Sequence, residues 1–133
     1  MWLTTNSPTK FGIQLDEGFI VGGVSSGATL AAVLSQQAHD RNLRPPLTGA
    51  FISIPLLLVE EIVPEKYRVQ WRSRKENTED PAVSQESIKN ILQILNPDIT
   101  SPLFSPFNAS NTHKGLPPTY VQVGGLDHCV MLA

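Results

Sequence analysis

The sequence contains little that would commit it to disulfides, to a membrane or to nucleic acid. Its one cysteine, Cys129, excludes an internal disulfide framework and fits a reducing compartment. Ten basic against twelve acidic residues give a net charge of −2, with no basic stripe for nucleic acid or an anionic bilayer. The longest apolar run, residues 52–59, is interrupted by Ser53 and Pro55 and is too short to cross a bilayer. We therefore expect a cytoplasmic protein with no nucleic-acid or membrane partner.

The sequence also lacks the common signatures of bound metals and nucleotides. Its three histidines and one cysteine do not have the spacing of metal ligands. The glycine-rich segment at residues 22–27 has neither the Gly-x-Gly-x-x-Gly pattern of dinucleotide sites nor the Gly-Lys-Ser/Thr of phosphate-binding loops. We accordingly expect no cofactor and no metal.

Three short segments have the character of strands. Residues 18–22 form an apolar run bounded by glycines, as in a buried strand. Residues 50–54 form a second run that Pro55 ends. Residues 119–123 are rich in β-branched and aromatic side chains, and they predict a third strand.

Two segments have helical periodicity. The first helix begins at the glycine-rich turn and is predicted to end near Asn42, because Pro45-Pro46 prevents its continuation. Its predicted apolar face consists of Leu30, Val33, Leu34 and Ala38. The second helix covers residues 84–95, with Ser84 as its N-terminal cap. Strands that alternate with helices predict an α/β fold with a parallel sheet of about three strands.

A Gly-x-Ser-x-Gly motif, Gly23-Val24-Ser25-Ser26-Gly27, lies between the first predicted strand and helix. The pattern places Ser25 on a sharp turn, where small residues at Gly23 and Gly27 let the strand and the helix approach closely. The Ser25 hydroxyl is then raised above the carboxyl end of the sheet. The backbone N–H of Ser26, at the start of the helix, is a candidate oxyanion donor. The alternative is a turn without chemistry, which the strand–turn–helix context disfavours.

A serine nucleophile needs a base, and the base needs an orienting carboxylate. Asp127 follows the third predicted strand, where the triad acid is expected; the alternative is a turn aspartate after Gly124-Gly125. The three histidines are poorly placed as the base. His39 lies at the end of the first helix, His113 lies in a polar loop, and His128 is adjacent to Asp127. We interpret each of them as a solvated or turn residue.

Two long segments and a short one match a known family in order and spacing: residues 19–32, residues 115–127 and, more weakly, residues 71–77. Through them the chain resembles the hormone-sensitive-lipase-like group of α/β-hydrolases, the alpha/beta hydrolase fold-3 family, and especially its fungal members. The resemblance implies a carboxylesterase- or lipase-like serine hydrolase acting on small ester substrates, in fungal secondary metabolism. It makes Ser25 the nucleophile and Asp127 the triad acid.

The resemblance also implies that residues 1–133 form a partial domain. The family's His-Gly-Gly oxyanion loop would precede Met1, and the similarity ends at Asp127, before the family's histidine. We therefore expect a truncated chain with an incomplete triad, containing about three of the family's eight strands. Its first strand would be an open edge, through which we expect self-association. The alternative function is an inactive remnant or a module that binds small ligands.

Overall fold

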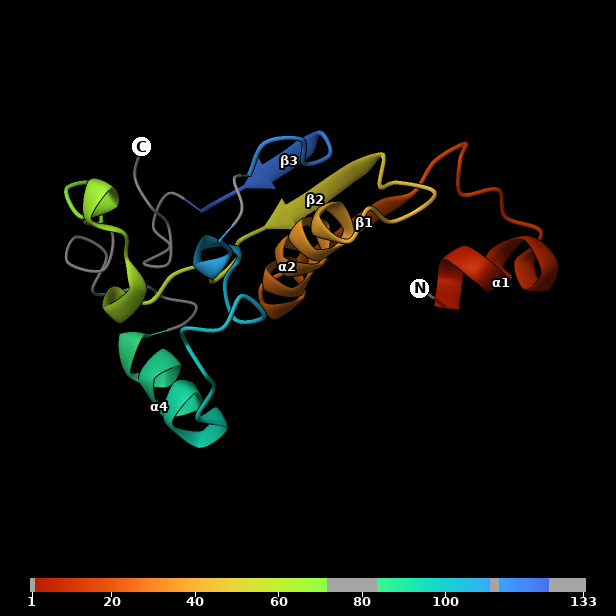
Figure 1. Ribbon diagram of the computed structural model, residues 1–133. Coiled ribbons are helices and arrows are strands. Elements are labelled where there is room, and N and C mark those ends of the chain that lie inside the picture. The colour runs from red at the N-terminus through yellow and green to blue at the C-terminus, as the bar shows by residue number, and fades with distance from the viewer. Residues whose placement is uncertain (1, 72–83, 111–112, 125–133) are drawn as a thin grey trace.

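A computed structural model describes residues 2–71, 84–110 and 113–124, arranged about a three-stranded parallel sheet (Figure 1). The strands are β1 (Ile20–Val24), β2 (Gly49–Ser53) and β3 (Thr119–Gln122), and they lie in that order. Each begins and ends within two residues of its predicted bounds. The predicted α/β fold with a parallel sheet is confirmed.

The three strands end level with one another at their carboxyl ends. Val24 of β1 is paired with Ser53 of β2, and Ser53 is paired in turn with Gln122 of β3. Because all the strands are parallel, the segments that follow them leave the sheet at one common edge. Ser25 is the first residue to do so after β1.

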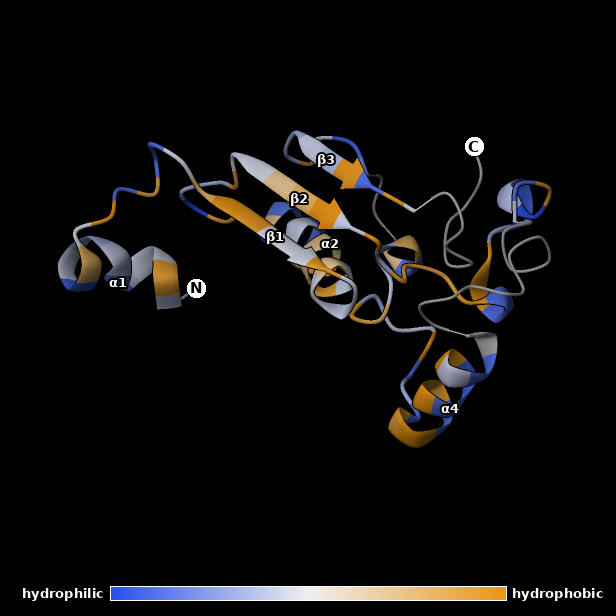
Figure 2. Cartoon of the chain, turned by 180° about the vertical axis from the view of Figure 1, so that it is seen from behind, coloured by the Kyte–Doolittle hydropathy of each residue, from blue (hydrophilic) through white to orange (hydrophobic). Residues whose placement is uncertain are grey.

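Helix α2 (Ser26–Asp40) connects β1 to β2 and packs on one face of the sheet (Figures 1 and 2). The core between them is made of small and β-branched side chains, namely Ala28, Ala31, Ala50 and Ile52. Alanines on the helix allow its backbone to approach the strands closely. The helix ends two residues before the predicted Asn42, which has a left-handed φ of 49°.

The predicted apolar face of α2 is only partly correct. Val33 is buried, but Leu30 and Leu34 are 60% and 54% exposed. The sheet packs against the side of the helix that carries the small residues Ala28 and Ala31, so the two leucines do not face the core. Periodicity alone did not distinguish the two faces, because both carry apolar residues at helical spacing.

The remaining helices lie outside the sheet. Helix α4 (Gln85–Leu95) has the predicted cap, because the Ser84 hydroxyl accepts a hydrogen bond from the Ser87 N–H at 3.2 Å. Helix α1 (Trp2–Phe11) has no counterpart among the sequence predictions. The described residues also include three short 3₁₀ helices: η1 (Glu60–Ile62), η2 (Glu65–Tyr67) and η3 (Pro106–Asn108). Across the described ranges, no helix has the length and apolar character needed to cross a membrane.

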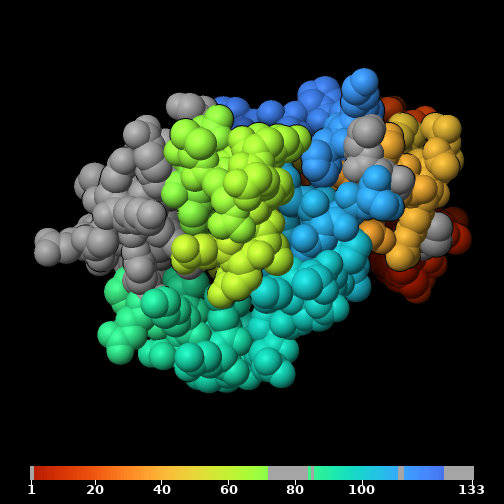
Figure 3. Space-filling model, turned by 60° about the vertical axis from the view of Figure 1, so that its left-hand side comes forward, coloured from red at the N-terminus to blue at the C-terminus, as the bar shows by residue number. Residues whose placement is uncertain are grey.

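Two chain segments that are distant in sequence cover one side of the molecule. Residues 55–71, which follow β2, and residues 84–110 form a continuous surface in the space-filling view (Figure 3). Tyr67 and Phe107 meet edge to face, with ring centroids 6.2 Å apart. The 3₁₀ helix η3 also contacts α2, so this layer is tied to the helix that follows Ser25.

Both outer strands carry exposed apolar side chains. Ile20 and Val24 of β1 are 69% and 57% exposed, and Tyr120 of β3 is 61% exposed. Tyr120 stacks on Phe51 of β2, with centroids 5.6 Å apart and an interplanar angle of 4°. Within the described residues, β1 pairs with β2 alone, as expected for an open edge.

Candidate active site

Ser25 occupies a strained turn between β1 and α2. It is the N-terminal cap residue of α2 with φ 55° and ψ −122°, and its side chain is exposed. A positive φ is costly for a residue with a Cβ, and it persists only where the surroundings impose it. Here the Ser25 N–H donates to the Ser53 carbonyl at 2.9 Å, and the Ser25 carbonyl accepts from the Thr29 N–H at 3.1 Å. The turn is therefore fixed by β2 on one side and by α2 on the other.

Gly23 provides the space for this turn. A Cβ added there would overlap the backbone carbonyl of Gly27 and lie 2.8 Å from the nitrogen of Ala28. Around Gly27, an added Cβ would meet nothing within 4 Å among the described residues. The sequence interpretation assigned a spatial role to both glycines. In the structure only Gly23 is required to lack a side chain, because at this residue the strand contacts the backbone of the helix.

The first turn of α2 presents backbone N–H groups beside Ser25. Ser26 is the first residue of the helix, and the N–H groups of a first turn have no intrahelical acceptor. The helix dipole adds partial positive charge at this end. The first turn contains no acidic residue that would oppose an anion. The arrangement can therefore stabilise negative charge that develops next to the Ser25 hydroxyl.

The segment after β2 is bonded to both of its neighbours at the carboxyl edge. Ile54 has a φ of 45°, and its N–H donates to the Gln122 carbonyl at 2.7 Å. The Thr29 hydroxyl contacts both backbone groups of Leu56, each at 3.1 Å. Thr29 was not among the site residues predicted from the sequence. Its position in a helical pattern carries no signal of a partner that is 27 residues away.

The predicted acid, Asp127, lies outside the described residues. The structure describes β3 and its continuation as far as Gly124, and β3 ends level with the strand before Ser25. Two strand spacings of about 4.8 Å separate β1 from β3, or roughly 10 Å across the edge. Residues 123 and 124, which follow β3, therefore leave the sheet at the same edge as Ser25.

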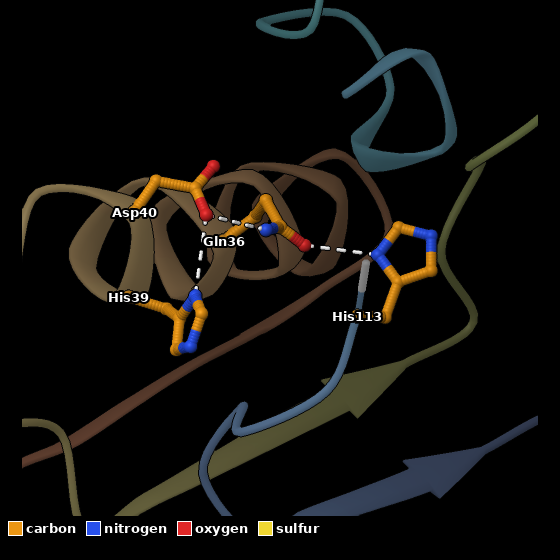
Figure 4. A network of polar contacts seen from close by, with 4 residues as sticks. All are labelled: Gln36, His39, Asp40 and His113. Carbon is orange, nitrogen blue, oxygen red and sulfur yellow. Dashed lines mark hydrogen bonds and ion pairs between the residues drawn. The ribbon is translucent and has the colours of Figure 1, made fainter. Parts of the chain in front are cut away.

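Neither described histidine lies beside Ser25. His39 follows Ser25 by fourteen positions on α2, which at 1.5 Å per residue is roughly 20 Å along the axis. Its Nδ1 lies 3.2 Å from Asp40 Oδ1 (Figure 4). His113 lies near the same end of the helix, where its Nδ1 is 2.9 Å from Gln36 Oε1. The third histidine, His128, lies outside the described residues.

His113 is an exposed loop residue, as interpreted from the sequence, but it also has a partner that the sequence did not predict. Gln36 is 2% exposed and donates from Nε2 to Asp40 Oδ1 at 2.9 Å, so its Oε1 accepts from His113 (Figure 4). The His113 ring also meets Phe107 edge to face, with centroids 5.5 Å apart. His113 therefore anchors its loop to α2. A partner 77 residues away left no local signal in the sequence.

Two hollows in the surface lie away from Ser25. One of about 230 Å³ lies near the end of α2 and is lined in part by His39, Arg44 and Gly115. The other, of about 420 Å³, lies between α1 and β1 and is lined in part by Trp2 and Leu34. Neither of these two hollows includes Ser25.

The chain matches the family model described as the alpha/beta hydrolase fold over residues 1–131. It is 32% identical over 126 residues to an AB hydrolase superfamily protein of Schizosaccharomyces pombe, covering 95% of this chain and 37% of that protein. It is 28% identical over 120 residues to the versiconal hemiacetal acetate esterase of Dothistroma septosporum, covering 90% and 36%.

A solved structure, that of vibralactone cyclase, superposes with a TM-score of 0.89 at 28% identity. The match covers 98% of this chain and 38% of the cyclase. The chain thus spans little more than a third of the length of the proteins it resembles.

Proposed function

The chain belongs to the alpha/beta hydrolase fold family, and from this premise we propose that it is a serine hydrolase acting on carboxylic esters, with Ser25 as the nucleophile. One observation carries the proposal. Ser25 is an exposed residue with φ 55°, held between the end of β1 and the start of α2. Strain of this kind is typical of a nucleophile that must project from a sharp strand-to-helix turn.

The proposed reaction is acyl transfer through a covalent intermediate. Ser25 Oγ attacks the ester carbonyl while a base accepts its proton, and the Ser26 N–H donates to the oxygen that becomes negative. The attack gives a tetrahedral intermediate. Its collapse expels the alcohol, which takes the proton from the base, and leaves an acyl-serine ester. Water then attacks that ester by the same steps and releases the carboxylic acid.

Asp127 is proposed as the carboxylate that orients the base. Support comes from the sheet, because the chain after β3 leaves the same edge as Ser25. A carboxylate in this role holds the base in its reactive orientation and stabilises its protonated form. Neither His39 nor His113 is proposed as that base, because each is hydrogen bonded near the far end of α2.

The substrate class is proposed from the relatives. One of them is named an acetate esterase, which supports esters of short acyl groups. The open position of Ser25 is compatible with a small ester, since the described residues leave its side chain exposed. We place the reaction in fungal secondary metabolism on the family resemblance of residues 19–32 and 115–127.

A second candidate function is a catalytically inactive, small-ligand-binding module. One observation favours it: neither of the two described histidines lies near the Ser25 hydroxyl. Without a base, a serine hydroxyl is a poor nucleophile at neutral pH. The two candidates differ in the reactivity of one oxygen atom, so a direct chemical test separates them.

A fluorophosphonate probe provides that test, because it phosphonylates an activated serine and leaves ordinary serines unmodified. We expect the full chain to be labelled at Ser25 and the Ser25→Ala variant to remain unlabelled. The matched control is Ser26→Ala, which removes the neighbouring hydroxyl but keeps the backbone N–H, and it should be labelled normally. A full chain that stays unlabelled while folded by circular dichroism would refute the hydrolase and favour the binding module.

A further inference from the structure

One hydroxyl on α2 links the turn at Ser25 to the segment that follows β2. The Thr29 Oγ1 lies 3.1 Å from the Leu56 N–H nitrogen and 3.1 Å from the Leu56 carbonyl oxygen. It also lies 3.4 Å from the carbonyl oxygen of Ser25. Thr29 therefore contacts the backbone of the residue that follows β1 and the backbone of the segment that follows β2.

The donor and acceptor capacity of Thr29 matches the needs of Leu56. A hydroxyl has one proton to donate and two lone pairs to accept with. The Leu56 N–H donates to Oγ1, and the hydroxyl proton goes to the Leu56 carbonyl, which is nearer than that of Ser25. Leu56 belongs to neither a helix nor a strand, so no ladder supplies these bonds. The Ser25 carbonyl already accepts the Thr29 N–H at 3.1 Å.

The segment that Thr29 holds begins at the carboxyl edge of the sheet, beside Ser25. Since β2 is the central strand, the chain leaves it between the ends of β1 and β3. Its start is held by the bond from the Ser25 N–H to the Ser53 carbonyl and by the bond from Ile54 to Gln122. Leu56 is the next point of attachment, and its partner lies on the helix that Ser25 caps.

We propose that Thr29 is a positioning residue of the site, whose hydroxyl sets the segment around Leu56 against the Ser25 turn. The inference rests on the proposed function, because the segment would form the wall that a bound acyl group contacts beside Ser25. Thr29 does not touch the reacting atoms. It acts through the backbone of Leu56, and loss of its hydroxyl would let that wall move away from the nucleophile.

Three variants of the full chain test the proposal. Thr29→Val is nearly isosteric and replaces the hydroxyl with a methyl group, whereas Thr29→Ser keeps the hydroxyl. The matched control is Thr48→Val, because Thr48 Oγ1 accepts the Phe19 N–H at 2.8 Å at the opposite end of the sheet. Each variant is measured by hydrogen exchange at the Leu56 amide and by the rate of fluorophosphonate labelling at Ser25.

We expect Thr29→Val to lose about tenfold in exchange protection at Leu56 and about tenfold in labelling rate. Thr29→Ser should restore both values to within about twofold, and Thr48→Val should change neither, although it too removes a hydrogen bond to the backbone. The loss in Thr29→Val should appear in the maximal labelling rate more than in the concentration of probe that gives half of it.

The two proposals fail in different ways. If Leu56 keeps its protection in Thr29→Val, the bond does not hold the segment, and the inference about Thr29 is wrong. If protection is lost but labelling is unchanged, the hydroxyl is purely structural and its positioning role is refuted. A wild-type chain that is never labelled refutes the hydrolase, and with it the catalytic consequence, while exchange at Leu56 still decides whether Thr29 holds the segment.

Discussion

Replacing Gly23 with alanine tests whether the turn at Ser25 depends on the close approach of β1 and α2. The new Cβ would overlap the carbonyl carbon and oxygen of Gly27 and approach the nitrogen of Ala28 to 2.8 Å. These are backbone atoms, so no side-chain rotation can relieve the overlap. Either the first turn of α2 moves away from the strand or the Ser25 turn opens.

The expected cost is about 3 kcal/mol in the free energy of unfolding. Forcing one methyl group into a packed site costs about 1–3 kcal/mol, and the upper end applies where backbone must move. Domains of this size unfold with about 5–15 kcal/mol, so the variant should remain folded while unfolding at clearly lower denaturant. The strain at Ser25 gives the backbone a second way to relax, because a more open turn would relieve its positive φ.

Gly27→Ala is the matched control. It is four residues away on the same turn and makes the same chemical change, but its Cβ would meet nothing within 4 Å among the described residues. Because Gly27 is in the first turn of α2, alanine there should stabilise the helix by up to about 1 kcal/mol. The two substitutions are thus expected to shift stability in opposite directions.

Urea unfolding followed by circular dichroism gives the two free energies, and fluorophosphonate labelling gives the reactivity of Ser25. We expect Gly23→Ala to unfold earlier and to be labelled more slowly, and Gly27→Ala to match or exceed the original chain in stability. Equal unfolding midpoints for the two variants, with equal labelling, would show that the close contact at Gly23 does not shape the turn.

Three further predictions concern other parts of the chain. His113→Ala removes the hydrogen-bond donor to the buried Gln36 carbonyl and should cost about 1–2 kcal/mol in urea unfolding; an unchanged midpoint would contradict the anchoring role. Ile20→Lys places a charge on the open strand β1 and should reduce self-association in sedimentation, whereas Val69→Lys, at an 82% exposed site, should not; equal behaviour would exclude that edge as the interface. Hydrolysis of p-nitrophenyl acetate by the full chain should fall by several orders of magnitude in the Ser25→Ala variant, and equal turnover by the two proteins would contradict the role of Ser25 as the nucleophile.

Much of the arrangement around Ser25 follows from patterns within a few residues. Glycines bound the first strand, and a Gly-x-Ser-x-Gly segment precedes a helical repeat, so strand, turn and helix were predicted in the right order. The cap at Ser84 was equally local, because its hydroxyl bonds to the N–H three residues ahead. Interactions between residues only a few positions apart depend on local chain geometry, so they can be predicted from a single sequence.

The packing of α2 illustrates where local patterns stop. Leu30 and Leu34 have the right spacing for a core-facing side, yet the sheet packs against Ala28 and Ala31. The choice depends on how closely the helix can approach the strands, which Gly23 and the alanines determine together. No property of the helical repeat by itself reveals that distance.

The sequence by itself determined the order of the three strands and of helices α2 and α4, the serine turn and the family to which the chain belongs, because each depends on residue types at short, fixed spacings. Tertiary structure alone decided that Thr29 bonds to Leu56, 27 residues away, and that His113 bonds to Gln36, 77 residues away. Such bonds form only after parallel strands have aligned in register and a helix has packed on them. Which residues become partners depends on their positions in the folded structure, and those positions cannot be read from their separation along the chain.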